Sequence, residues 1–512
     1  MTENQNTEEP KVEETIGEPQ LATTSQEGYG EVVAPRYKGF LGKVDKFYGI
    51  TKMKSSFKTE IVAGCTTFMT MVYILMVHPN MFAETGEVSY GAMYIVTALS
   101  AIVGTLLMSF LAKIPFAQAP GMGLNAFFVY TICMTMGYTY AQALLIVLFS
   151  GFLFLFLTII GARKAIVRAV PACIRVAISA GIGLFVAFVG LQNAGLIVPD
   201  AGTGVALVSF NLRTFTTDGA TMIAAAISIA SLIIIAIFSK LNFKASIVLG
   251  IVGSALMYYA CCGIGVAVGS ESCKAVFTTI SEEFNLNPFV AFQEFGTQAF
   301  GQVFKNGFTV PSNMIFDFIA ALVAFAMVDM FDTLGSLMGA CQAAGKESGL
   351  IDEKGEVKNI QRALLSDSIA TCTGAILGTS TVTTFVESAS GVAVGGRTGM
   401  TALVVAVLFA VAMFLSPIAA LIPSCATAGA LVYVGVLMMR NVIDIDWKDP
   451  ATAVPAFLTI AVMSFAYSIS YGIAAGFISY TLIKLCTGKI KEISPVTAVL
   501  SLVFIFTFLF TH

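Results

Sequence analysis

The sequence is poor in charged residues, histidine and tryptophan. Only 12% of its 512 residues are Asp, Glu, Lys or Arg, and it has two histidines and one tryptophan. Soluble domains carry about 25% charged residues, which cover their surface in water. The shortage excludes soluble enzymes, nucleic-acid-binding proteins and secreted disulfide-rich scaffolds. Because 57% of the residues are hydrophobic, we expect a chain that is embedded in a lipid bilayer and has no nucleic-acid partner.

The ten cysteines form no CxxC pair and no cluster with histidine. Metal sites and redox motifs require such spacing, so we expect no metal and no cofactor. The chain has only two histidines, which are too few to form a proton relay of histidines across the membrane.

The N-terminal region divides into two parts of opposite charge. Residues 1–35 are polar and acidic with no apolar run, which is typical of a disordered tail, and residues 36–58 form a basic lead-in. Cytoplasmic flanks of membrane proteins carry such an excess of Lys and Arg. We therefore expect a cytoplasmic N-terminus and a multi-pass protein of the plasma membrane, in bacteria the inner membrane.

Fourteen apolar stretches follow, each near the length of about 20 residues that a bilayer crossing needs. They are 59–78, 91–112, 116–136, 139–160, 170–195, 219–239, 245–267, 314–338, 361–379, 381–394, 398–416, 418–439, 452–469 and 471–486. We expect an all-α membrane protein with a first seven-span repeat over 59–268, an outer loop over 269–313, and a second repeat over 314–512. Residues 493–511 are a further apolar segment, either a fifteenth crossing or part of a bent span.

The third span of each half is short and interrupted. Pro115 and Pro120 remove backbone donors in the first half, while residues 381–386 of the second half are β-branched and aromatic, which favours a strand. We expect a short extended strand followed by a half-helix in each. Matching broken segments are a sequence indicator of a transporter's binding site. Two ordinary kinked helices are the alternative.

Four acidic residues lie inside predicted spans: Asp329, Asp332, Asp367 and Glu387. An aspartate at a helix centre costs about 2.5–3.5 kcal/mol on insertion scales, so each needs a reason. Asp329 and Asp332, three residues apart, share a helix face. Two acids so close should not both be ionised, which predicts a site that takes up and releases a proton. The alternative is that one of them only caps backbone or binds a serine of a neighbouring helix.

Glu387 and Asn125 lie where the two extended pieces should turn into half-helices. A helix dipole stabilises a carboxylate there, and asparagine offers both a donor and an acceptor. Such a set suits a flat heterocycle with donors and acceptors along one edge. The alternatives are that Glu387 is a helix cap and Asn125 a turn residue.

Two further polar residues are given structural roles. We expect Asp367 to form an ion pair with Arg362 at a span end, and His78, which precedes Pro79, to bind a helix end.

Five motifs resemble the xanthine/uracil permease superfamily, in its AzgA-like branch of adenine/guanine/hypoxanthine permeases. They are residues 60–73 (EIVAGCTTFMTMVY), 119–126 (APGMGLNA), 328–335 (VDMFDTLG), 374–381 (GAILGTST) and 386–399 (VESASGVAVGGRTG). The resemblance implies two inverted seven-span repeats, split into a core and a gate domain, and proton-coupled purine uptake. It also implies that Asn125, Asp332 and Glu387 bind substrate or couple the proton. His78 departs from the family pattern, which usually has asparagine there.

These observations together predict a proton symporter that imports purine nucleobases (hypoxanthine, guanine or adenine) by alternating access, and not an enzyme. Its partners are the purine base, protons and lipid, and whether two copies form a homodimer is left open. The alternatives are an anion transporter of the sulfate-permease type and an integral-membrane enzyme. The expected proton-coupling residues are Asp332, Asp329 and Glu387. The expected substrate contacts are Glu387, Asp332, Asn125, Phe385, Phe127, Thr384 and Ser388.

Overall fold

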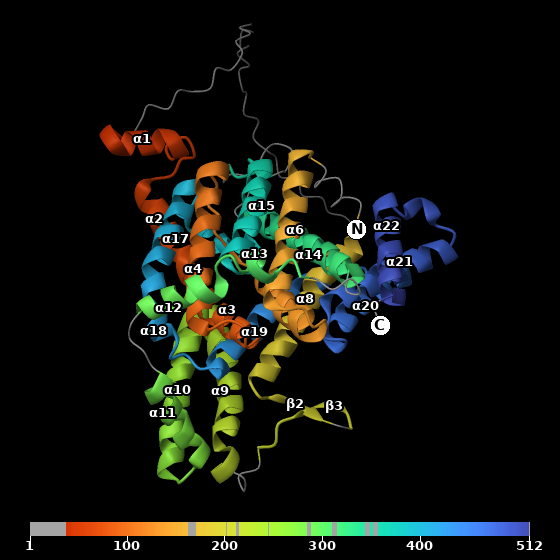
Figure 1. Cartoon of the computed structure of the whole chain (residues 1–512). Coiled ribbons are helices and arrows are strands. Elements are labelled where there is room, and N and C mark those ends of the chain that lie inside the picture. The colour runs from red at the N-terminus through yellow and green to blue at the C-terminus, as the bar shows by residue number, and fades with distance from the viewer. Residues whose placement is uncertain are drawn as a thin grey trace, which may run out of the picture.

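The computed structural model describes residues 37–161, 170–200, 202–210, 215–243, 245–283, 288–309, 315–343, 349–351 and 357–510. The acidic tail over residues 1–35 lies outside the described residues. The described chain is an assembly of helices with two short pairs of strands (Figure 1).

The first half of the chain contains helices at every predicted span, and the broken third span consists of a strand followed by two short helices. Its elements are α1 (Gly39–Tyr48), α2 (Phe57–Met71), α3 (Ile74–Ala83), α4 (Tyr90–Leu107), the π-helical η1 (Met108–Ala112), β1 (Gln118–Pro120), α5 (Met122–Ala126), the π-helical η2 (Phe127–Thr135), α6 (Tyr140–Ile159), α8 (Ala172–Asn193), β2 (Ile197–Asp200), β3 (Gly204–Leu207), α9 (Phe215–Lys240) and α10 (Ser246–Ala267).

The predicted outer loop has helices of its own, and the second half repeats the pattern of the first. The loop contains α11 (Glu271–Glu283), α12 (Pro288–Glu294), the π-helical η4 (Phe295–Ala299) and α13 (Gln302–Asn306). The second half contains α14 (Ile315–Ala343), α15 (Ile360–Leu377), β4 (Val382–Thr384), α16 (Ser388–Val394), α17 (Gly399–Ala412), η7 (Met413–Leu415), α18 (Ser416–Ala419), α19 (Ser424–Met439), η8 (Arg440–Asp444), α20 (Pro450–Phe465), α21 (Ile469–Cys486), η9 (Ile490–Glu492) and α22 (Pro495–Phe510).

Within the described residues, nine helices are long and apolar enough to cross a membrane. Most of the other predicted spans are shorter or broken, because prolines and strands interrupt them: η2 follows β1, α16 follows β4, and α20 contains Pro455. The predicted fold is confirmed: a membrane protein built of helices, with short strands only where the third and tenth spans are broken. The segment that the sequence left open becomes α22, a separate apolar helix packed against α21 and α14.

Short polar side chains begin several of the spans. Ser56, Ser89 and Thr139 accept hydrogen bonds from the backbone N–H groups of the first turns of α2, α4 and α6, and Thr139 forms a capping box with Gln142. Each such cap contributes about 1 kcal/mol to its helix. The spans therefore start where the apolar pattern of the sequence starts.

The helices form two groups, which we name the core group and the gate group. The core group consists of α2, α3, α4, α6, α14, α15, α16 and α17, and the gate group of α8, α9, α10, α19, α20 and α21. In Figure 1, α2, α4 and α17 run side by side, and α9 and α10 form a pair away from them. This is the expected division into core and gate domains, with each group drawing helices from both halves of the chain.

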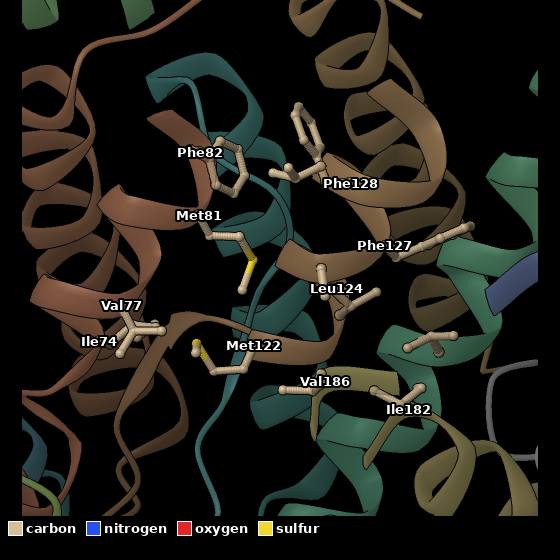
Figure 2. Close-up of a cluster of buried hydrophobic side chains, with 14 of the residues drawn as sticks. Ile74, Val77, Met81, Phe82, Met122, Leu124, Phe127, Phe128, Ile182 and Val186 are labelled. Atoms are coloured by element: carbon tan, nitrogen blue, oxygen red, sulfur yellow. The ribbon is translucent and has the colours of Figure 1, made fainter. Parts of the chain in front are cut away.

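Helix α5, which packs against α3 of the core group, meets the gate group through apolar side chains. Figure 2 shows Met122 and Leu124 of α5 near Ile182 and Val186 of α8, with side chains of α3 close by. A Cβ at Gly123 would overlap Ile182. The half-helix after β1 therefore lies directly against a gate helix.

Candidate functional site

The two broken spans cross each other as a pair of antiparallel strands. Gln118 of β1 is opposite Thr384 of β4, Ala119 is opposite Thr383, and Pro120 is opposite Val382. Gly121 donates to the carbonyl of Thr381 at 3.1 Å, and Phe385 donates to the carbonyl of Ala117 at 3.0 Å. The expected extended pieces are therefore bonded to one another, although about 260 residues separate them in the sequence.

Gly121 makes the crossing possible. A Cβ at this position would lie 2.8 Å from the hydroxyl of Thr383 and 3.5 Å from the carboxylate of Asp332. A side chain here would displace Thr383 of β4, whereas the distance to Asp332 is an ordinary van der Waals contact. The glycine that follows Pro120 thus suits the close approach of β1 and β4.

Side chains of neighbouring helices satisfy the outer edge of β1. Thr105 of α4 accepts from the N–H of Gln118 at 3.0 Å and donates to its carbonyl at 2.9 Å, while Ser388 accepts from the N–H of Ala117 at 3.0 Å. Within a bilayer, every backbone polar group needs a partner inside the protein. These contacts explain how a strand is tolerated at membrane depth.

Glu387 lies between β4 and α16, directly before the first residue of that half-helix. Its side chain is half-buried, and the hydroxyl of Tyr73 donates to its Oε1 at 2.7 Å. Tyr73 lies between α2 and α3 and is 1% exposed. Sequence reasoning did not identify Tyr73, because a tyrosine in an apolar span has the pattern of an ordinary core residue.

Asp332 of α14 faces the same crossing. Thr383 of β4 donates to its Oδ2 at 3.4 Å. Asp367 and Glu387 both act electrostatically on its carboxyl group, so the three acids are neighbours. The structure therefore brings together Asp332 and Glu387, as the sequence led us to expect.

Asp329, one turn earlier on α14, has different surroundings. It is fully buried and acts electrostatically on the thiol of Cys372 in α15. Among the described residues, Asp329 interacts electrostatically with α15, whereas Asp332 accepts a hydrogen bond from β4.

The expected ion pair between Asp367 and Arg362 is wrong. Asp367 is fully buried and accepts from Thr333 at 2.7 Å and from Gln118 at 3.5 Å, whereas Arg362 is exposed. Residues five apart on a helix point in different directions, so the arginine stays at the surface. Asp367 instead links α15 to α14 and β1.

The remaining candidate residues line the crossing as follows. Asn125 is fully buried, donates to the carbonyl of Pro120 at 3.2 Å and accepts from Ser380, so it ties α5 to the start of the second broken span. Thr384 lies within 3.4 Å of the Gln118 amide. Phe127 packs against Phe325 of α14 with ring centroids 4.8 Å apart, and Phe385 is buried.

His78 is buried between three elements. Its Nδ1 lies 2.7 Å from the hydroxyl of Thr97 in α4, and its Nε2 lies 3.0 Å from the hydroxyl of Thr379. Because the Thr97 hydroxyl donates to the carbonyl of Met93, Nδ1 donates to that hydroxyl, and in a neutral ring Nε2 accepts from Thr379. His78 therefore links α3 to α4 and to Thr379, which follows the C-cap of α15.

A bundle of membrane helices whose two broken spans cross over paired acids has the architecture of a secondary transporter. The sequence model described as the permease family, that of the xanthine/uracil permeases, matches residues 58–475. The chain belongs to this family, and it is a multi-pass membrane permease rather than an enzyme.

Curated relatives match it along nearly their whole length. The adenine permease AdeP of Escherichia coli (strain K12) is 35% identical over 474 residues, which are 92% of this chain and 96% of AdeP. The guanine/hypoxanthine permease PbuO of Bacillus subtilis (strain 168) is 36% identical over 461 residues, which are 89% of this chain and 98% of PbuO.

Among solved structures, the transmembrane domain of the cyanobacterial bicarbonate transporter BicA has a similar fold. The TM-score is 0.54 at 12% identity, over 82% of this chain and 97% of that domain. The inverted-repeat arrangement of core and gate is therefore common to both.

Proposed function

We propose that the chain is a proton-coupled symporter that imports purine nucleobases across the plasma membrane by alternating access. The bases are adenine, guanine or hypoxanthine, the substrates named in the relatives AdeP and PbuO. In this proposal the N-terminus is cytoplasmic, because residues 36–58 are basic, and the repeats occupy residues 59–268 and 314–512.

The observation that carries the proposal is the pair of half-buried acids beside the strand crossing. Glu387 and Asp332 are near enough to interact electrostatically, and they flank β4. A carboxylate accepts hydrogen bonds from ring and exocyclic N–H groups of a purine. The polar groups of the crossing would form hydrogen bonds with the other polar atoms along the edge of the base. A neutral planar base therefore fits the charge of this site.

The same acids argue against the anion-transporter alternative. BicA shares the fold, but a site for an anion needs positive charge, whereas Asp332, Glu387 and Asp367 gather negative charge here. An incoming proton has the charge that this site favours. Uptake of one proton by the pair relieves the repulsion between the two carboxylates and so couples proton and base.

Movement of the gate group against the core group would expose the site to each side in turn. The ring of Tyr130 in η2 makes edge-to-face contacts with Phe185 of α8 and with Tyr467, which precedes α21. These contacts belong to the interface that must open for the site to face the other side of the membrane.

Uptake of radiolabelled hypoxanthine and adenine tests the proposal in cells that lack their own purine uptake. We expect Glu387→Gln and Asp332→Asn to lower uptake at least about tenfold, because each removes a charged hydrogen-bond acceptor. A protonophore should abolish accumulation by the wild type. Glu271→Gln, which removes an exposed carboxylate in α11, is the matched control and should transport normally. Full activity and an unchanged pH response in both site variants, at equal amounts in the membrane, would overturn the assignment.

A further inference from the structure

The first span, Phe57–Ala83, winds more tightly for two residues where it meets the candidate site. Helix α2 ends at Met71 and α3 begins at Ile74. Tight turns close the gap, since Leu75 donates to the carbonyl of Val72 at 3.1 Å and Met76 to that of Tyr73 at 3.0 Å. Tyr73 lies in this tight turn, and its hydroxyl contacts Glu387.

Tyr73 reaches Glu387 from a surface that is already fastened to α16. Thr70, one turn earlier, lies 3.0 Å from the hydroxyl of Ser390 and 3.4 Å from the carbonyl of Glu387. A Cβ at Gly391 would lie 2.7 Å from the carbonyl of Ala63. Helices α2 and α16 are therefore in close contact, and the phenol is held in place relative to the carboxylate.

The chemistry of the contact decides which oxygen of Glu387 is available. An ionised carboxylate only accepts hydrogen bonds, so the Tyr73 hydroxyl must donate to Oε1. Resting on the proposed function, we propose that Tyr73 is a positioning residue: it occupies Oε1 and orients the carboxyl group so that Oε2 meets the purine and the proton. Asp332 of α14 is a second acidic group that interacts electrostatically with this carboxylate.

Loss of the hydroxyl then has two consequences. The carboxyl group becomes free to rotate, so base binding weakens, while the helices that move during transport are unchanged. The charged form of Glu387 also loses the hydrogen bond that favours it. Uptake falls at low pH when Glu387 becomes protonated and can no longer accept hydrogen bonds from the base. Without the Tyr73 hydroxyl, this fall in uptake, the acidic limb of the pH profile, therefore occurs at a higher pH.

The test compares Tyr73→Phe with Tyr94→Phe. Tyr94 of α4 is also buried, and its hydroxyl donates to the carbonyl of Ala412 at 2.8 Å. Each variant loses one buried phenol hydrogen bond and keeps its ring, but only Tyr73 contacts Glu387. Initial rates of hypoxanthine uptake are measured over a range of concentrations and external pH values, at matched amounts of protein in the membrane.

We expect Tyr73→Phe to raise the half-saturating hypoxanthine concentration about tenfold, with a maximal rate within about twofold of wild type. Its acidic limb should move to higher pH, and Tyr94→Phe should alter neither. Equal behaviour of the two variants, in the presence of normal wild-type uptake, overturns the role of Tyr73 and leaves the proposed function intact. Absence of purine uptake by the wild type overturns both.

Discussion

Gln118 and Thr384 are opposite one another in the strand pair although 266 residues separate them, and the amide of one lies 3.4 Å from the hydroxyl of the other. This contact joins the third span of the first half to the third span of the second. Asp332, Asp367 and Glu387 contact or adjoin this crossing. The site is therefore a product of the repeat: neither half of the chain builds it alone.

Gly121→Val should destabilise the crossing. A side chain at this position meets the Thr383 hydroxyl at 2.8 Å, and overpacking of this kind costs about 1–3 kcal/mol. We expect a lower midpoint of thermal unfolding in detergent and reduced uptake. Gly253→Ala in α10 is the control, because no atom lies within 4 Å of its added Cβ. An equal midpoint for the two variants would contradict the steric argument.

Asp332→Asn and Asp329→Asn should differ although the residues are one turn apart. Asp332 accepts a hydrogen bond from Thr383 of β4 and interacts electrostatically with Glu387, whereas Asp329 interacts electrostatically with Cys372. We expect the Asp332 variant to lose the dependence of uptake on external pH and the Asp329 variant to keep it. Hypoxanthine uptake at two pH values measures this. The reverse result would assign the proton to Asp329.

His78→Ala should lower stability by about 1–3 kcal/mol, because it leaves two buried hydroxyls, those of Thr97 and Thr379, without their histidine partner. His78→Asn can still donate to Thr97 and should lose less. The stability of both variants is measured by thermal unfolding, in which the exposure of the buried cysteines reports how much protein has unfolded. If uptake retained by His78→Asn had an altered pH profile while stability was normal, the histidine would have a role in proton transfer instead.

Acidification should strengthen a contact between the core and gate groups at Glu84. Asn193, the last residue of α8, donates to Glu84 at 2.8 Å, and Tyr130 donates at 3.0 Å. Glu84 is an exposed residue, but neighbouring side chains keep water from part of its carboxyl group, which raises the pKa of Glu84, and these two hydrogen bonds oppose the shift. The pKa of Glu84 is higher when its carboxyl group is in this contact than in an open form, in which water surrounds the carboxyl group. The proton therefore favours the contact, whose stabilisation is present at low pH and lost as pH rises through the raised pKa.

Hydrogen exchange at the end of α8 measures this effect. After correction for the intrinsic rate, the wild type should be more protected at about pH 5 than at about pH 7. Glu84→Gln keeps the hydrogen-bonding shape but cannot titrate, and should show no such difference. The same pH response in the variant would mean that another group is responsible.

Much of this architecture follows from sequence pattern. The apolar stretches predicted over 381–394 and 471–486 correspond to β4 with α16 and to α21, and the strand in each broken span was expected from Pro120 and from the β-branched run at 381–386. These features depend on local chemistry, namely hydrophobic length, missing backbone donors and branched side chains. The deep acids were visible because charge in an apolar span is rare and costly.

What the sequence by itself determined is the class of protein, the order of its apolar spans, the two interruptions, and the residues Glu387 and Asp332 as candidates for the site. The tertiary structure alone decided the partners: that Gln118 meets Thr384, that Asp367 faces Thr333 and not Arg362, and that Tyr73 binds Glu387. The reason is physical. Hydrophobicity and backbone preference act over a few residues and are written in the local sequence, whereas a hydrogen bond between distant spans depends on where the whole chain brings two side chains together.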